Sequence, residues 1–200
     1  MNDQIFETVV TTCSPAGVVH VAPMGVRYRG ERVVLKPFRP STTLDNILAT
    51  RLAVLNLVDD VRVFAGCVTG RRNFATVDAQ RAGEPRAVRL ACAMEHLLLR
   101  LDEVDDDPER PTLGLLRVHE ARHAPWRGFN RAQAAVIEGA VLVSRLRMLP
   151  PEKIASEMRY LQIAIDKTAG DAEREAWGWL QEAVERHAAT TAAAVEGAAR

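Results

Sequence analysis

The chain reads Lys36-Pro37-Phe38-Arg39-Pro40-Ser41-Thr42-Thr43-Leu44-Asp45-Asn46-Ile47 at the point that says most about its fold. A run of hydroxyl residues comes directly before apolar residues at helical spacing. A helix is therefore predicted to begin there, with Thr42 and Asp45 placed to form a capping box. The β-branched run Arg32–Leu35 in front of it predicts a strand. This stretch joins the end of a strand to the start of a short helix.

Upstream of this stretch, the sequence predicts short antiparallel strands joined by tight turns. Ile5–Cys13 is rich in β-branched residues, a Ser-Pro-Ala-Gly turn follows it, and Val18–Val26 resumes the apolar run. Tyr28–Glu31 forms a second break before Arg32–Leu35. Glycine, proline and serine at such breaks are typical of turns between paired strands. The first third of the chain is therefore predicted to be a β-meander.

Downstream, more strands are predicted. Leu52–Val58 is a continuous apolar run short enough for a buried strand, whereas Val61–Val68 fits either a helix or a strand. Ala87–Val104 is long enough for two strands, and Leu113–His123 predicts one more. The acidic run Asp105–Pro111 between them is predicted to be a solvated loop.

The hydrophobic period changes from two to about 3.6 after Gly128, which indicates helices. The first helix is predicted to begin with Asn130 as its N-cap and to stop at Pro150-Pro151. A second ends at Thr168–Asp171, and a third continues toward the alanine-rich tail Ala188–Arg200. We therefore expect a mainly β domain over residues 1–127 and a helical extension over residues 128–200. Such an extension packs on the domain or on a partner chain.

Composition limits the classes of function. The chain has 200 residues, 48% of them hydrophobic and 26% charged, which is ordinary for a soluble globular protein. Because 26 basic residues balance 26 acidic ones, the chain has no net charge. No overall electrostatic field therefore attracts nucleic acid or an acidic membrane surface. No apolar run approaches the ~20 residues that cross a bilayer. We expect no nucleic-acid partner and no membrane insertion.

The cysteines and the first residues of the chain indicate where in the cell the protein is expected. The cysteines are Cys13, Cys67 and Cys92, with no CxxC pair, and we interpret them as core thiols rather than nucleophiles. Neither a disulfide framework nor a charged-then-apolar leader at Met1–Val10 is present. A cytoplasmic location is expected.

The turn at residues 36–47 is also the most specific candidate for a ligand site. Lys36 and Arg39 bring two cations to the start of a helix, where unpaired backbone N–H groups and the helix dipole favour an anion. Lysine occurs elsewhere only as Lys153 and Lys167, and its compact ammonium suits a phosphate. The alternative is that Ser41 or Thr42 only caps the helix and that the basic residues are solvated.

A second candidate is Ala22-Pro23-Met24-Gly25-Val26, an apolar strand that contains proline and glycine. Glycine in a strand indicates a bulge or a place where a flat ligand approaches the backbone. A kink in an edge strand would explain the same residues.

A third pattern is His119-Glu120-Ala121-Arg122-His123, which has the H-E-x-x-H spacing of zinc hydrolases. That chemistry needs a helix, and the preceding Leu113–Val118 predicts a strand, with Pro125 shortly after. We therefore favour ordinary strand or loop histidines and assign no metal ligand. The sequence contains neither a glycine-rich dinucleotide fingerprint nor a P-loop.

Val21–Val26, followed by Lys36–Phe38 and Ser41–Ile47, resembles in order and spacing the flavin-binding region of the FMN-binding split-barrel superfamily. That superfamily includes flavin reductases and pyridoxamine-phosphate-oxidase-like proteins. Within it, the whole chain is similar to a branch catalogued as domain of unknown function four hundred forty-seven. The segment Phe129–Ala132 resembles the start of that branch's helical extension.

The resemblance implies an α+β, mainly β fold: an antiparallel split β-barrel of the FMN-binding type with a C-terminal helical extension. It implies FMN as cofactor and these cofactor-binding residues: Met24, Gly25, Val26, Lys36, Pro37, Phe38, Ser41, Thr42, Thr43 and Asn46. The resemblance implies that Lys36 and the hydroxyl residues at 41–43 contact the phosphate and that Met24–Val26 border the flavin ring. Asn46 braces the loop, and Phe38 packs nearby.

The resemblance also implies a homodimer with flavin near the subunit interface. The function expected from it is a flavin-dependent oxidoreductase acting on a small molecule, and a role in tetrahydromethanopterin-linked one-carbon metabolism is suspected for this branch. Because a flavin carries the redox chemistry itself, no side chain has to look catalytic. The alternatives are a flavin-binding module or carrier without turnover and a zinc hydrolase built on His119, Glu120 and His123.

Overall fold

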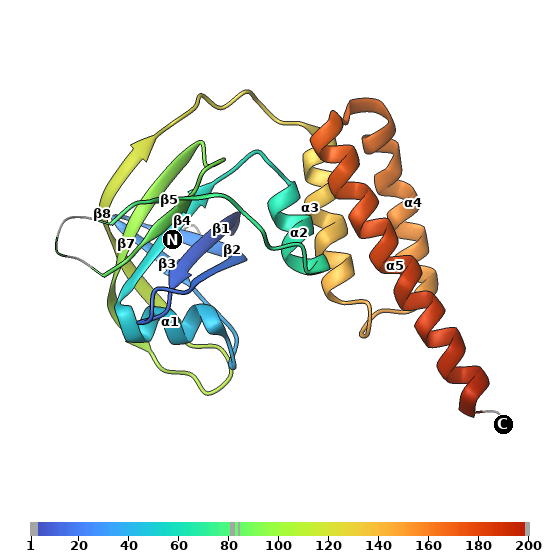
Figure 1. Cartoon of the computed structure of the whole chain (residues 1–200), viewed down its shortest axis with the longest axis horizontal. Helices are drawn as coiled ribbons and strands as arrows, with labels where there is room; N and C mark the ends of the chain where they lie inside the picture. Colours follow the sequence, from blue (N-terminus) through green and yellow to red (C-terminus); the bar gives the residue numbers. More distant parts are fainter. Residues whose placement is uncertain (1–3, 81–82, 84, 199–200) are drawn as a thin grey trace. The chain divides into compact units, whose positions relative to one another are not determined.

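The structure is a computed structural model that describes residues 4–80, 83 and 85–198. The chain forms two compact units (Figure 1). One comprises the residues up to Asp59 together with Asn73–Trp126, and the other comprises Asp60–Arg72 together with Arg127–Arg200. The helical unit thus includes a segment from the middle of the chain that the sequence alone did not assign to it.

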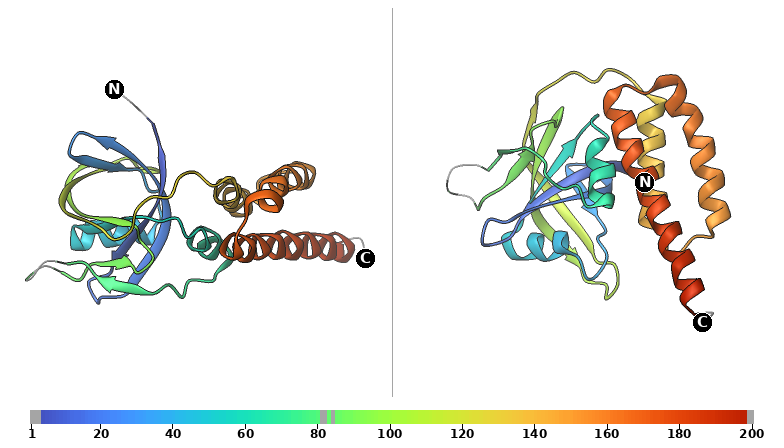
Figure 2. Two further views of the ribbon diagram at one scale, coloured as in Figure 1. Left: turned by 90° about the horizontal axis from the view of Figure 1, so that it is seen from above. Right: turned by 45° about the vertical axis from the view of Figure 1, so that its right-hand side comes forward.

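The first unit is a closed antiparallel barrel with strand order β1-β2-β3-β8-β7-β4 (Figure 2). Its strands are β1 (Phe6–Cys13), β2 (Val19–Arg29), β3 (Arg32–Leu35), β4 (Leu52–Leu57), β7 (Glu95–Asp105) and β8 (Thr112–Arg122). A separate two-stranded sheet contains β5 (Thr76–Asp78) and β6 (Val88–Leu90). The predicted meander and the predicted barrel class are therefore confirmed.

The barrel core forms because alternate residues of each strand point inward. Leu55, Leu99 and Leu115 come from three different strands and are fully buried there. The helix α1 (Thr42–Thr50) adds Leu44 and Ile47 to the same cluster. A smaller cluster lies on the outer face of β4 and β7. The helix α1, which follows the turn that begins at Lys36, thus contributes to the barrel core.

The start of α1 differs in detail from the predicted capping box. Ser41 is the N-cap, with an extended backbone at φ −154°, and its Oγ accepts a hydrogen bond from the Leu44 amide at 3.4 Å. Thr42 is already helical, so Thr42 and Asp45 do not form the box. At the other end, the Arg51 amide donates to the Ile47 carbonyl at 2.8 Å with φ 60° at Arg51.

The second unit contains four helices among the described residues: α2 (Arg62–Thr69), α3 (Arg131–Ser144), α4 (Pro151–Thr168) and α5 (Asp171–Ala198). The ambiguous run at 61–68 is therefore a helix. Asn130 caps α3 as predicted, because its side chain accepts from the amides of Ala132 and Gln133. The last two residues of the predicted alanine-rich tail lie outside the described residues. None of the described helices combines the length and the apolar character needed to cross a membrane.

Close packing and ion pairs hold the helices of this unit together. Gly139 of α3 lies so close to α5 that an added Cβ would come within 2.8 Å of the Trp177 ring. The Trp177 indole donates to the Gln162 side chain of α4 at 2.7 Å. Arg62 of α2 and Arg71, which follows the C-terminal end of that helix, pair with carboxylates of α5 at 3.2 and 2.6 Å. All four helices therefore share contacts within one bundle.

Candidate functional site

The turn between β3 and α1 gathers the residues predicted to hold a phosphate. Lys36 directly follows β3, whose Leu35 pairs with Val26 of β2, and Lys36 is half-buried. Ser41 is half-buried and Thr42 is exposed at the start of α1. Because the first amides of a helix have no partner within it, this end offers N–H donors beside the two hydroxyl groups. A phosphate group fits the chemistry of this turn.

Two other predicted residues are buried in α1. Thr43 is 1% exposed and Asn46 is 6% exposed. The Asn46 Nδ2 donates to the Thr12 Oγ1 of β1 at 3.0 Å. This contact joins α1 to β1, and a role of Asn46 toward a cofactor stays a prediction. The Thr43 side chain is almost completely buried, and its contact with a phosphate stays a prediction.

Arg110 is a residue of this region that the sequence reasoning missed. Its guanidinium carbon lies 4.5 Å from the centre of the Phe38 ring, and its Nε donates to the Lys36 carbonyl at 3.1 Å. Phe38 is 64% exposed, whereas Pro37 is buried. The arginine therefore adds a third cation to this turn, beside Lys36 and Arg39. Cation–π contacts of this kind contribute about 0.5–1 kcal/mol at exposed sites.

The loop that carries Arg110 is exposed but is held against the turn between β3 and α1. The Asp107 carboxylate accepts from the amides of Glu109 and Arg110 at 2.9 and 2.7 Å, and these hydrogen bonds hold its pKa below the ordinary value. Arg39 forms an ion pair with Asp106, and its amide donates to the Glu109 carbonyl. Residues 106–110 form an exposed loop, as predicted, and the contacts of Arg39 hold this loop to the turn between β3 and α1. Nothing local in the sequence shows which turn it contacts.

The β2 segment predicted to border a flavin ring lies in a regular strand. The β1–β2 register runs without interruption from Phe6 opposite Val26 to Cys13 opposite Val19, so no bulge is present. The Val26 side chain is fully buried, and Met24 packs against the same barrel core. A Cβ on Gly25 would lie 2.8 Å from the Ile5 Cγ2. Contact between these residues and a ring stays a prediction.

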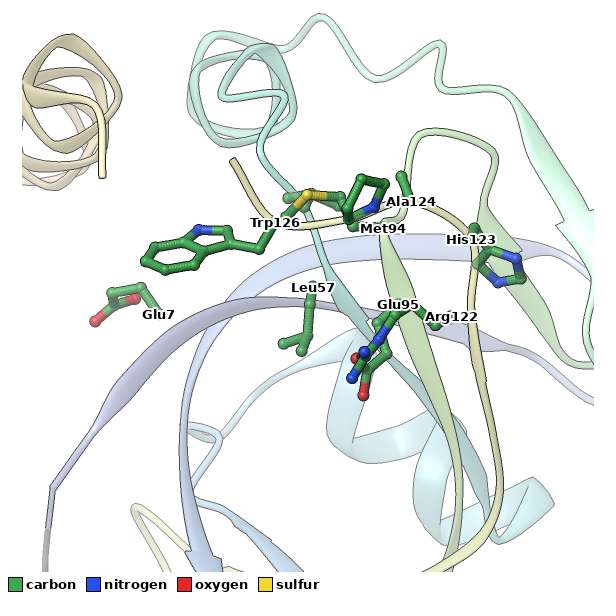
Figure 3. A pocket seen from close by; sticks show the side chains of 10 residues that line it. Glu7, Leu57, Met94, Glu95, Arg122, His123, Ala124 and Trp126 are labelled. Carbon is green, nitrogen blue, oxygen red and sulfur yellow. Dashed lines mark hydrogen bonds and ion pairs between the residues drawn. The ribbon is translucent and has the colours of Figure 1, made fainter. Parts of the chain in front are cut away.

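The barrel unit contains a pocket of about 810 Å³ that the sequence did not indicate (Figure 3). Its lining residues are Glu7, Leu57, Val58, Met94, Glu95, Arg122, His123, Ala124, Pro125 and Trp126. Glu95 pairs across the sheet with both Leu57 and Arg122, so three neighbouring strands contribute to one wall. The Arg122 Nε lies 3.3 Å from the Glu95 carboxylate.

This pocket and α1 lie at opposite ends of the barrel. The strand β4 begins at Leu52, just after α1, and ends at Leu57 in the pocket wall. Figure 1 shows α1 at the lower end of the barrel and β4 running from there toward the upper end. The pocket residues come from distant parts of the sequence, so only the strand register brings them together.

A pair of histidines lies at the edge of the pocket. The Nδ1 of His96 in β7 is 2.8 Å from the Nε2 of His123. His96 is 4% exposed, and its other ring nitrogen, Nε2, is buried without a hydrogen-bond partner. Burial, followed by the charges of His123, Arg89 and His119, lowers the pKa of His96 to about 4, although the Ala121 carbonyl acts in the opposite direction. Burial and Arg89 also lower the pKa of His123.

The H-E-x-x-H spacing does not form the site of a zinc hydrolase. His119 lies on β8 and His123 directly follows it, so the helical geometry that this chemistry requires is not formed there. Within residues 4–80, 83 and 85–198, no group of three His, Cys, Asp or Glu side chains is placed to hold a metal ion. The spacing has a different meaning, because residues four apart on a strand face the same side.

Comparisons with known proteins agree with the fold. A structure from Methanosarcina mazei, described as an FMN-bound protein of the DUF447 family, superposes with a TM-score of 0.76 at 23% identity and covers 91% of this chain and 96% of that one. The 2-nitrobenzoate 2-nitroreductase NbaA of Pseudomonas fluorescens gives 0.51 at 19% identity over 62% of this chain and 66% of its own. The flavin reductase HpaC, solved with NADP+, gives 0.51 at 11% identity over 62% and 81%. These similarities show a shared split-barrel fold. No curated protein matches the sequence.

Two family models match the chain, one for each predicted part. The N-terminal domain of the protein of unknown function DUF447 matches residues 6–124. The C-terminal model of the same family, described as protein of unknown function (DUF447), matches residues 130–182. Together they span most of the chain, so this protein belongs to the DUF447 family.

Proposed function

We propose that this protein binds FMN, with the phosphate at the turn between β3 and α1. The observation that carries the proposal is the arrangement of Lys36, Ser41 and Thr42 around the start of a helix that Asn46 ties to β1. An ammonium, hydroxyl groups and unpaired helical amides are the groups that hold a phosphate. The Methanosarcina mazei structure, described as FMN-bound, supports this assignment because it shares the fold over nearly the full length.

We further propose that the protein is a flavin-dependent oxidoreductase that acts on a small molecule. Bound FMN supplies the hydride or electron transfer, while the protein positions it and tunes its environment. The flavin reductase HpaC and the nitroreductase NbaA share the barrel, which makes reduction by NADH or NADPH the first activity to test. A carrier of the tetrahydromethanopterin type is the substrate class to test next, on the resemblance alone.

The quaternary structure that we propose is a homodimer with flavin near the subunit interface. Phe38 belongs to the turn assigned to FMN, and Ile5 lies beside Gly25 of the other assigned segment. Both side chains are exposed, and a second subunit would cover such apolar side chains. Sedimentation equilibrium with and without FMN tests this, with a dimer as the expected species.

The decisive experiment compares FMN with riboflavin, which has the same ring but no phosphate. Replacing Lys36 by Ala should weaken FMN binding by the value of a charge-assisted hydrogen bond, on the order of 1.5–3 kcal/mol, and leave riboflavin unchanged. The matched control is Lys153→Ala, because that lysine pairs with Glu157 on α4. Flavin fluorescence titration measures both. Equal losses for both flavins, or none for FMN, would contradict the phosphate site.

A second measurement separates the enzyme from a flavin carrier without turnover. NADH and NADPH are added without oxygen to the FMN-loaded protein, and the visible flavin absorbance is followed. Bleaching at a rate above that of free FMN supports the oxidoreductase. A spectrum that either donor leaves unchanged supports the carrier.

A further inference from the structure

Arg110 lies against the segment that leads from β3 into α1. Its Nε donates to the Lys36 carbonyl at 3.1 Å, and its guanidinium carbon lies 4.5 Å from the centre of the Phe38 ring. Figure 1 shows the loop between β7 and β8, which carries this arginine, at the same lower end of the barrel as α1. The turn between β3 and α1 is therefore bordered by a cation from 74 positions further along the chain.

The contacts around Arg110 continue the pairing of β3 with β8. Beyond the last residues of that ladder, the Arg39 amide donates to the Glu109 carbonyl at 2.9 Å. Lys36 is half-buried and Phe38 is exposed, whereas the residue between them is buried. This alternation indicates that the side chains of Lys36 and Phe38 lie on the same side. Arg110 reaches that side from the neighbouring segment.

The carboxylates of the same loop do not neutralise Lys36 and Arg110. Asp106 is paired with Arg39, and the Asp107 carboxylate accepts two amide hydrogen bonds within its own loop. Among the residues that the structure describes, neither Lys36 nor Arg110 forms an ion pair with a carboxylate. Two cations without a carboxylate partner thus border one turn, and an anion placed there would be attracted to both.

Arg117 of β8 makes similar contacts at the other end of β3. Its guanidinium carbon lies 6.0 Å from the centre of the Tyr28 ring, and its Nη2 donates to the Gly30 carbonyl at 3.0 Å. Its Nη1, however, lies 3.8 Å from the Glu120 carboxylate. Arg117 therefore has the packing contacts of Arg110 together with a carboxylate partner, which makes it a matched control.

The charge of these two cations matches a terminal phosphate. A phosphate with one ester bond carries about −1.5 to −2 charges at pH 7, and a phosphate esterified on both sides carries less. An ammonium acts on it as a point charge, and a guanidinium can donate two parallel hydrogen bonds. Because Nε is the guanidinium nitrogen that bonds the Lys36 carbonyl, Nη1 and Nη2 of Arg110 are left for such a ligand.

We propose that Arg110 binds the phosphate of FMN and gives the site its preference for a terminal phosphate, and hence for FMN over FAD. This inference rests on the proposed function, because the phosphate is the one assigned to Lys36 and Ser41. It adds the loop between β7 and β8 to the site as a second segment of the chain. In FAD the corresponding phosphate is esterified on both sides, so it offers less charge to the two cations.

Fluorescence titrations of the full chain with FMN, FAD and riboflavin test this preference. The unchanged protein should bind FMN at least about tenfold more tightly than FAD. Arg110→Gln should weaken FMN about tenfold, weaken FAD less than about threefold and leave riboflavin unchanged. Arg110→Lys keeps the charge and should retain FMN affinity within about threefold. Arg117→Gln should leave all three affinities unchanged.

Three results of these titrations would overturn the role of Arg110. Equal losses for FMN and riboflavin in Arg110→Gln would show that the arginine only keeps the turn in shape. Unchanged FMN affinity in Arg110→Gln would show that it does not contact the phosphate. FAD bound as tightly as FMN by the unchanged protein would show that the site does not select a terminal phosphate.

Inorganic phosphate separates this inference from the assignment of flavin. Added to the unchanged protein, it should shift the NMR signals of the Thr42 and Thr43 amides and of the Arg110 Nε, and in Arg110→Gln the amide shifts should need at least about threefold more phosphate. These shifts without FMN binding would contradict the proposed function and support the phosphate contact of Arg110. Weaker FMN binding in Lys36→Ala but not in Arg110→Gln would contradict this inference alone. Neither FMN binding nor a phosphate shift would overturn both.

Discussion

Asn46 in α1 donates from Nδ2 to the Thr12 hydroxyl in β1 at 3.0 Å, and both side chains are almost completely buried. This hydrogen bond joins two elements 34 positions apart in the sequence. It fixes the helix whose first turn faces the proposed phosphate. The position of that turn relative to the barrel therefore depends on a buried polar contact as well as on the apolar residues of α1.

Replacing Asn46 by Ala should lower the free energy of unfolding by about 1–3 kcal/mol, since the Thr12 hydroxyl loses its partner in a buried place. Urea denaturation measures this. Thr42→Ala is the control, because Thr42 is exposed on the same helix and should change stability by less than about 0.5 kcal/mol. Equal effects of the two substitutions would show that the contact contributes nothing.

The stability of the barrel unit should depend on pH through His96. Its pKa is about 4 in the folded chain, against an ordinary value of 6.5. The unfolded chain therefore binds more protons between these values, and stability should fall as the pH drops from 6.5 toward 4. His96→Leu should flatten this part of the profile, and His119→Asn should preserve it. Urea midpoints measured from pH 7.5 to 4.5 test this, and an equally steep fall in His96→Leu would refute it.

Two glycines of the helical unit should respond in opposite ways to alanine. In Gly139→Ala the new Cβ would lie 2.8 Å from the Trp177 ring and 3.1 Å from Leu180. A loss of about 1–3 kcal/mol is expected from this overpacking. Around Gly178 of α5 an added Cβ meets nothing within 4 Å. Gly178→Ala should therefore stabilise the helix by about 0.5–1 kcal/mol. Thermal melting followed by circular dichroism compares them, and the same sign for both would contradict this packing.

Gly25→Ala tests whether a flavin ring lies at β2. The neighbouring Ile5 side chain is 50% exposed and can move, so the barrel should tolerate the new methyl group. If the ring borders this segment, FMN and riboflavin should weaken alike, by about tenfold or 1.4 kcal/mol. This differs from the expected effect of Lys36→Ala, which spares riboflavin. Unchanged affinity for both flavins would place the ring elsewhere.

Local signals explain why much of the fold could be predicted from the sequence. Alternation, turn residues and caps act over a few positions, and they located the strands of the barrel, the start of α1 and the Asn130 cap, but not the short β5. The run at 61–68 stayed ambiguous because a short apolar segment fits both periods. The choice between Ser41 and Thr42 as N-cap depended on one backbone conformation, which composition does not determine.

The site was only partly predictable for a related reason. Lys36, Ser41 and Thr42 are neighbours in the sequence, so their spacing was visible. The contact of Arg110 with Phe38 and the pairing of His96 with His123 depend on strand register, which no local pattern reports. The same register changes the meaning of the H-E-x-x-H spacing, from one face of a helix to one face of a strand.

The segment Asp60–Arg72 has a consequence for how the chain folds during synthesis. Its helix α2 buries Val63 and Phe64 and contacts α3 and α5, which are made only after β7 and β8. During synthesis on the ribosome, the apolar side chains of α2 therefore stay exposed to solvent until more than half of the chain has been made after it. Neither unit is a simple tandem module, because the polypeptide leaves the barrel, returns to it and leaves again. A chain that ended at Arg127 would contain the barrel and α2 but not the helices α3 and α5 against which α2 packs.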